Sequence, residues 1–314
     1  MSTVPGASTE HGARSAWRVA TSRNFGPYFL GNAVSASGTW FHNLTAAVLV
    51  YDLTHSAFLL GVLTFCQFAP VLVLSPWAGR VADAYDRRKV LLVTQPAAAV
   101  LSALLALLTW SGHVSVAAVL VVSAGLGVLT AFANAAQMAL VGSLVSRDDL
   151  PQAVALNSVT FNLARVLGPL GAAAVIAVFG KGAAFAVNSL SFLVLTVGVS
   201  LVHAEPVRRM GRTTVREGLA VLRASPRLLV YLAVVVTVSF AADPINTEGP
   251  ALAHAFGLSP LWAGAIVGVF GGGAVSAGIL VGARRSTPRR VARMLALMGL
   301  GLVGLAVSPW FAVG

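Results

Sequence analysis

Long apolar runs, each about the length of a membrane-spanning helix, constrain the fold of this 314-residue chain more than any other feature. Crossing ~30 Å of hydrocarbon takes about 20 helical residues. Runs of that length fall at roughly 27–51, 58–79, 90–110, 114–141, 152–179, 183–203, 227–245, 260–282 and 292–310. None has the alternation of apolar and polar residues that is typical of barrel strands. The sequence therefore predicts an all-α integral membrane protein with about nine helices.

Composition excludes an ordinary water-soluble domain. Hydrophobic residues make up 57% of the chain and charged residues only 10%, whereas soluble domains carry about 25% charged residues. The formal net charge of +11 could suggest a nucleic-acid partner. However, the basic residues are clustered between apolar runs and form no basic face, so we expect a lipid bilayer as partner and no nucleic acid.

The positions of the basic residues predict the orientation of the helices. All but two of the 21 lysine and arginine residues fall in the N-terminal tail or in alternate connections, which places them on one side of the membrane. The exceptions are Lys181, on the other side, and Arg165, inside a span. The positive-inside rule puts the basic side in the cytoplasm. We therefore expect a multi-pass protein of the plasma (inner) membrane with a cytoplasmic N-terminus.

A basic linker divides the predicted spans into two groups. Residues 1–24 are expected to form a cytoplasmic tail and residues 25–204 a bundle of six helices. The linker, 205–226, contains the stretch TTVREGLAVLRA, whose capping box and apolar spacing predict an amphipathic helix on the inner membrane surface. Residues 227–314 would then hold about three helices of a second, incomplete bundle.

Motifs for enzymatic chemistry are missing. The histidines are scattered without metal-ligand spacing, and no nucleophile elbow or phosphate-binding loop occurs. The lone Cys66 excludes an internal disulfide and a cysteine-based metal cluster. Gly264, Gly268 and Gly272 have the spacing of a helix-packing face, which we prefer to a nucleotide loop. We expect no enzyme activity, no catalytic residue, no metal and no cofactor.

Arg165, near the middle of the fifth span, is the most informative single residue. A central arginine costs ~2.5–3.5 kcal/mol on insertion scales, so it must face protein or a water-filled cavity. Ser158, Asn162 and Pro169 share its helix face, and Pro169 is expected to kink the helix. Arg165 is either a structural arginine held by neighbouring polar groups or a cavity residue that attracts anionic groups. Small residues at Ala164, Gly168 and Gly171 form an adjoining face where another helix can approach closely.

Other polar residues inside spans are weaker candidates for a cavity. Asn32, His42 and Gln137 are included among the possible substrate ligands. Each is individually more typical of an interhelical contact than of a ligand site. A proton relay through His42 is possible, because histidine titrates near neutral pH. No carboxylate in the middle of a span stands out as its counterpart.

The stretch AGRVADAYDRRKVLL, from Ala78 to Leu92, concentrates six charges between two apolar runs. The positive-inside rule accounts for Arg87, Arg88 and Lys89. It does not account for Asp83 and Asp86, because acidic residues contribute little to membrane orientation. Their presence predicts ion pairing or a helix N-terminus.

This stretch resembles the signature loop between the second and third spans of the major facilitator superfamily. The segments SASGTWFHNLTAAVLVYDLTHSA, ALNSVTFNLARVLGPLGA and AFAVNSLSFL are similar to its enterobactin exporter-like, or transmembrane secretion effector, branch. The match departs from the signature at Ala84, where an arginine is usual, and at Ala172 and Ala173, which replace a glycine. The resemblance covers nearly the whole chain in consistent order.

The resemblance implies two six-helix bundles with a cavity between them, working by alternating access. The sequence would then end before the last three helices, including the one expected to receive Asp83. The inner gating loop would consist of Gly79, Asp83, Asp86, Arg87 and Arg88. Arg165, Gly168 and Pro169 match the fifth-span motif associated with exporters.

From this resemblance we expect a secondary active transporter that exports small molecules such as drugs or siderophores, with protons as coupling ion, as in an antiporter. Two alternatives remain open. One is a truncated membrane protein that does not transport and serves as a binding or assembly partner. The other is an importer of the same fold.

Overall fold

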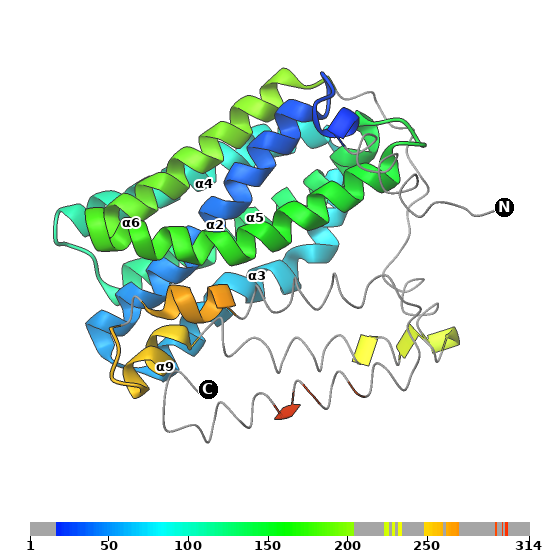
Figure 1. Cartoon of the computed structure of the whole chain (residues 1–314). Coiled ribbons are helices and arrows are strands. Elements are labelled where there is room, and N and C mark those ends of the chain that lie inside the picture. Colours follow the sequence, from blue (N-terminus) through cyan, green and yellow to red (C-terminus); the bar gives the residue numbers. More distant parts are fainter. Residues whose placement is uncertain are drawn as a thin grey trace, which may run out of the picture.

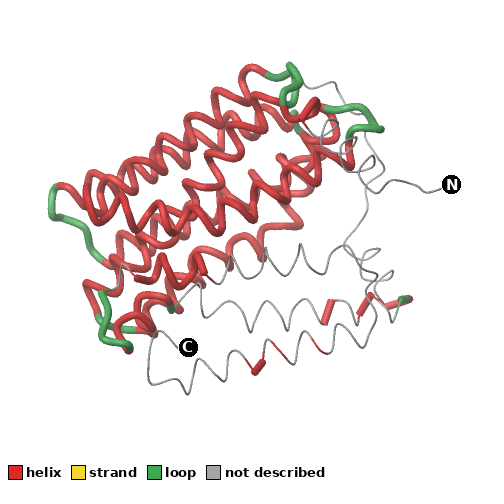
Figure 2. The backbone as a smooth tube through the Cα atoms, viewed as in Figure 1, coloured by secondary structure: helices red, strands yellow, loops and turns green. Residues whose placement is uncertain are grey.

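The computed structural model describes residues 17–203, 223–225, 228–229, 232–233, 248–259, 262–269, 293, 297 and 299–300. Regular structure in these ranges is entirely helical (Figure 2). The elements are α2 (Gly26–Thr54), α3 (Ala57–Ala84), α4 (Arg87–Trp110), α5 (Val116–Leu144), α6 (Leu150–Leu201) and the short α9 (Gly249–Ala255). The amphipathic helix at 205–226, most of the last three predicted spans and hence the helix count lie largely outside the described residues.

Four described helices, α3, α4, α5 and α6, are long and apolar enough to cross a membrane. Their ends follow local sequence signals. The hydroxyls of Ser56 and Ser115 accept from the backbone N–H groups of Leu59 and Ala118, which caps α3 and α5. The helical class predicted for the chain is confirmed.

Helix α6 is two spans joined at a sharp break. It contains 52 residues, and at 1.5 Å per residue that is ~78 Å, more than twice the hydrocarbon thickness. Gly180 interrupts it with φ 82° and ψ 172°, a conformation that side chains with a Cβ rarely adopt. The break falls between the predicted spans 152–179 and 183–203. Pro169 lies inside the first limb of α6, and the kink expected there stays a prediction.

Helix α2 passes between the two limbs of α6 (Figure 1). It is as long as its neighbours but more polar, and it buries Ser35, His42 and Thr45. In lipid such groups must face protein, so a central position suits this sequence. Helix α3 lies toward the edge, where Phe65 and Leu72 are 71% and 78% exposed.

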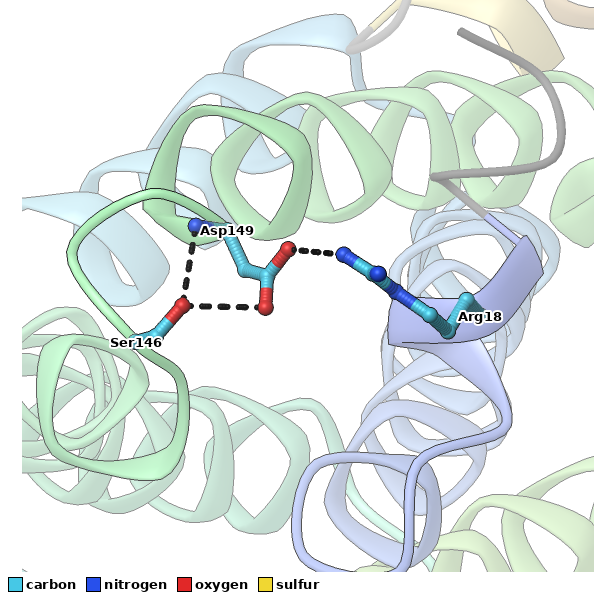
Figure 3. A network of polar contacts seen from close by, with 3 residues as sticks. All are labelled: Arg18, Ser146 and Asp149. Atoms are coloured by element: carbon cyan, nitrogen blue, oxygen red, sulfur yellow. Dashed lines mark hydrogen bonds and ion pairs between the residues drawn. The ribbon is translucent and has the colours of Figure 1, made fainter. Parts of the chain in front are cut away.

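The segment before α2 contacts the residues that follow α6. The Asn24 side-chain amide donates to the His203 carbonyl, and the His203 N–H donates to the Asn24 amide oxygen, both at 2.8 Å. Nearby, Arg18 forms an ion pair of 2.8 Å with Asp149, whose carboxylate also accepts from the Ser146 hydroxyl (Figure 3). These contacts attach the segment before α2 to the α5–α6 turn and to the end of α6.

Candidate functional site

Arg165 lies half-buried on the first limb of α6, with its guanidinium carbon 5.7 Å from the centre of the Trp40 ring on α2. This is the range of a cation–π interaction. Its Nε is buried without a hydrogen-bond partner. Among the described residues no carboxylate forms an ion pair with Arg165. Within the described part of the chain the charge therefore lies over an aromatic ring and has no acidic partner.

Small residues bring Trp40 to this position. A Cβ added at Gly168 would lie 2.5 Å from the Trp40 Cβ and 3.2 Å from the Ser37 carbonyl oxygen. One added at Gly171 would lie 3.0 Å from the Phe41 ring. Because these glycines have no side chain, α2 packs directly on the α6 backbone. The helix that lies against Gly168 and Gly171 is α2.

Phe161 completes an aromatic group around the arginine. Its ring meets the Trp40 ring edge-on at 6.4 Å and is 55% exposed. Sequence reasoning missed Trp40 and Phe161. Phe161 is four residues before Arg165 and so on its face of the helix, a spacing that could have been noticed. Trp40 is on another helix and gives no such signal.

Two helical turns earlier on the same pair of helices lies a second polar contact. The Asn32 amide on α2 lies 3.5 Å from the Asn157 amide oxygen on α6. Asn157 also hydrogen-bonds Tyr28. The stretch between α2 and the first limb of α6 thus has polar groups at two levels, one neutral and one cationic.

The remaining cavity candidates have contacts of their own. Asn162 is exposed and donates to the Ser158 carbonyl one turn back. His42 is buried on another side of α2, where it hydrogen-bonds the Ser123 hydroxyl at 3.3 Å and contacts the Phe185 ring. Gln137 lies half-exposed on α5. His42 therefore contacts α5 and the second limb of α6, away from the Trp40 side of α2.

The predicted inner gating loop is mostly helical. Helix α3 continues to Ala84, so its predicted end at residue 79 was too early, and Gly79 and Asp83 lie in its last turns. Asp83 is exposed and has no ion pair among the described residues. Asp86 is the N-cap of α4, because its carboxylate accepts from the Arg88 N–H at 2.9 Å. One acid therefore has the expected helix N-terminus, and the other has no partner here.

The arginines of this turn hold neighbouring helices. Arg88 donates to the carbonyls of Val199, at 3.0 Å, and Ser200. Those oxygens belong to the last turn of α6 and have no partner within the helix, and the negative end of the helix dipole favours a cation there. Arg87 donates to the Ala139 carbonyl of α5 at 3.1 Å. Both side chains stabilise packing as well as carrying charge.

The described residues 248–259 and 262–269, here called the second part of the chain, include a segment that contacts the first limb of α6. A Cβ at Gly264 would lie 2.7 Å from the Pro169 carbonyl oxygen and 2.7 Å from the Ala173 Cβ. Gly268 is equally close to Leu170. For these two glycines the expected packing role is confirmed; Gly272 lies outside the described residues. The 262–269 segment thus meets α6 one turn beyond Arg165.

A second contact between the two parts consists of aromatic rings. His254 of α9 lies 6.4 Å from the His55 ring and 5.8 Å from the Tyr51 ring at the end of α2. Glu248, at the start of α9, has one buried carboxylate oxygen without a partner, and burial raises the pKa of its carboxyl group. In the part of the chain that the structure describes, no group of three or more His, Cys, Asp or Glu side chains could hold a metal.

A groove of about 450 Å³ lies between α2 and the second limb of α6. Its lining is almost wholly apolar, with Ser37 and Ser191 as the polar exceptions, and it includes none of the predicted site residues. The groove is therefore separate from the Arg165 group.

Three relatives illustrate what the chain is similar to. It is 31% identical to the staphyloferrin A transporter of Staphylococcus aureus over 53% of this chain and 40% of the relative. It is 26% identical to the uncharacterized MFS-type transporter YfiS of Bacillus subtilis, over 81% and 62%. For macrolide efflux protein A of Streptococcus pyogenes the identity is 24%, over 89% and 72%. The chain thus aligns with less than two thirds of the length of the first two.

The model of the transmembrane secretion effector family matches residues 14–312. This match runs through all of the described helices, in agreement with the apolar spans described above. The chain is therefore a multi-pass membrane protein of the major facilitator superfamily and belongs to its transmembrane secretion effector family.

Proposed function

We propose that the protein is a secondary active transporter that exports small molecules across the plasma membrane by alternating access. The observation that supports this most is Arg165, which has no ion-pair partner among the described residues and lies on the limb of α6 that meets the 262–269 segment. A charge costs too much in lipid to be kept there without a use or a partner. Relatives named for staphyloferrin A transport and macrolide efflux support small molecules as substrates.

The contact between the two parts suits relative movement. Gly264 and Gly268 meet Pro169, Leu170 and Ala173 through backbone and short apolar side chains. Such surfaces have no interlocking charged side chains to separate when one bundle rocks against the other. The residues that would line the cavity are Arg165, Asn162 and Asn32, with Gln137 and His42 kept as weaker members.

Asp83 is proposed as the moving acid of an inner gate formed with Gly79, Asp86, Arg87 and Arg88. Its lack of a partner among the described residues leaves it free to pair with the second bundle. The other members have contacts of their own within the first bundle: Asp86 caps α4, and the arginines hold α5 and α6. Asp83 would therefore change partners while its neighbours remain fixed.

Export driven by the proton gradient is tested in a transport assay that compares two acids near the connection between α3 and α4, Asp83 and Asp86. The chain is reconstituted in proteoliposomes, and efflux of a panel of drugs and siderophores is followed with and without a protonophore. Asp83→Asn should abolish efflux without loss of membrane insertion, whereas Asp86→Asn, which keeps an N-cap acceptor, should retain it. Efflux by Asp83→Asn equal to that of the parent would show that Asp83 has no gating role and would leave membrane orientation as the function of the charges in this turn. No gradient-dependent transport by the parent would favour a binding or assembly role.

A cytoplasmic N-terminus is also part of the proposal. Among the described residues, Arg18 pairs with Asp149 at the α5–α6 turn and Arg88 reaches the end of α6, which gathers basic side chains at one end of the helices, as expected of a membrane interface with positive charge inside. In a Cys66→Ser background, cysteine at Arg87 should resist an impermeant thiol reagent in intact cells, and cysteine at Gly112 should react. The reverse pattern would overturn the orientation.

A further inference from the structure

We infer that Arg165, Trp40 and Phe161 form a recognition element for planar, carboxylate-bearing small molecules. This rests on the proposed function for its place in a transport cycle but not for binding itself. The three side chains come from two helices, and only Arg165 was among the residues expected to form a cavity.

The geometry of the guanidinium gives the first argument. The guanidinium carbon lies over the Trp40 ring, 5.7 Å from its centre, and an indole offers no hydrogen-bond acceptor to the arginine N–H groups. Among the described residues these groups have no acceptor, and Nε is buried. An unsatisfied buried donor on a cation is costly. A carboxylate matches the fork of donors in two parallel hydrogen bonds and would offset that cost.

The aromatic neighbours give the second argument. Phe161 is 55% exposed, so its ring is accessible to a ligand, and it stands edge-on to Trp40. A flat ligand next to these rings gains aromatic contacts that an aliphatic acid would not. An inorganic anion would satisfy the arginine alone. The element thus favours a carboxylate on a planar body.

The position gives the third argument. Gly168 and Gly171 fix α2 against α6, so Trp40 is held in place before any ligand binds, which lowers the ordering cost of binding. The next turn of α6, at Pro169 and Leu170, contacts the 262–269 segment. A ligand on Arg165 would therefore lie beside the contact between the two parts of the chain.

Binding of a matched pair of probes tests this class directly. The full chain in lipid nanodiscs is titrated by equilibrium dialysis with 1-naphthoate and with 1-naphthamide, an uncharged analogue of the same shape, and empty nanodiscs are subtracted. A charged hydrogen bond contributes enough for roughly tenfold or greater preference for the acid. Acetate serves as the aliphatic anion and should bind more weakly than 1-naphthoate.

Variants separate the roles of the three side chains. Arg165→Gln should abolish the preference for the acid, and Arg165→Lys should keep part of it. Trp40→Leu should weaken both aromatic probes. Arg80→Gln removes an exposed arginine near the inner end and should change nothing. If Arg165→Gln does not fold, the Lys variant and Trp40→Leu carry the test. Equal binding of acid and amide by the parent, or a preference that survives in Arg165→Gln, overturns the inference.

Failure of the inference and failure of the proposed function have different signatures. Gradient-driven export that is the same in the parent and in Arg165→Gln would keep the transporter and remove the acid-recognition element. Arg165-dependent binding of 1-naphthoate without any gradient-driven transport would keep the element and remove the transporter.

Discussion

Lys181 forms an ion pair of 2.5 Å with Asp52 and so joins the residue after the break in α6 to the last turn of α2. The distribution of lysine and arginine residues predicts that Lys181 lies on the outer side of the membrane, opposite the basic clusters. The side chains are 27% and 35% exposed, and the pair fixes the connection between the two limbs of α6 against the helix that runs between them.

Breaking this pair should have a modest effect. A double-mutant cycle of Asp52→Asn and Lys181→Gln should give a coupling of about 0.5–1 kcal/mol, because both groups are partly solvated and exposed pairs contribute little. Chemical unfolding of the purified protein measures it. The coupling should decrease with added salt; a coupling that is zero at low salt would show that the pair contributes nothing.

Gly168→Ala should destabilise the protein by about 1–3 kcal/mol, since the new methyl group would overlap the Trp40 Cβ and force α2 away from α6. Gly61→Ala is the matched control, because a Cβ there meets nothing within 4 Å. Thermal unfolding compares the two variants. Equal stability would contradict the close approach of α2 and α6.

Arg88→Gln should lower the free energy of unfolding by about 1–3 kcal/mol, because two carbonyls in the last turn of α6 lose their charged donor. Arg80→Gln removes the same charge from an exposed position and should leave stability unchanged. Urea unfolding distinguishes the variants. If both behave alike, Arg88 acts through charge and not through its contacts.

Asp86 should behave as a helix cap. Asp86→Ala removes the acceptor for the Arg88 N–H and should cost about 0.5–2 kcal/mol, whereas Asp86→Asn should be close to neutral. Thermal unfolding of both variants at neutral pH provides the measurement. A loss of stability in the Asn variant as large as in the Ala variant would mean that the charge matters and not the cap.

Glu248 should give a pH-dependent stability. Its pKa is raised in the folded state by burial, so folding favours the protonated form, and the favourable contribution is lost as pH rises through the folded pKa. Glu248→Gln should therefore be more stable than the parent at neutral pH and equal to it at acidic pH, below the unfolded pKa. Melting temperatures across that pH range test this. A difference that is constant with pH would exclude titration of Glu248 as the cause.

Hydropathy predicted the positions of the described helices well but their ends less well. The break in α6 follows from the gap between two apolar runs and from Gly180 within it. The end of α3 was placed at Gly79, because charges end the apolar run there. The helix nevertheless continues to Ala84: hydropathy indicates where a segment leaves lipid, whereas backbone hydrogen bonds and caps decide where a helix ends.

The candidate site was predictable only in part. Periodicity identified Arg165 and the small face at Gly168, since both lie on one helix. It could not identify Trp40, because the residue opposite a helix face depends on tertiary packing. For the same reason the sequence could not distinguish His42, which is buried among α5 and α6 side chains, from a cavity residue. Arg88 was assigned to orientation because charge counting carries no information on contacts.

The reciprocal hydrogen bonds of Asn24 and His203 have a consequence for synthesis. They join residues 179 positions apart, with five helices between them, and both partners are made before any residue of the linker. The segment from Asn24 to His203 can therefore complete its own closing contacts as soon as His203 has left the ribosome, before synthesis of the chain is finished.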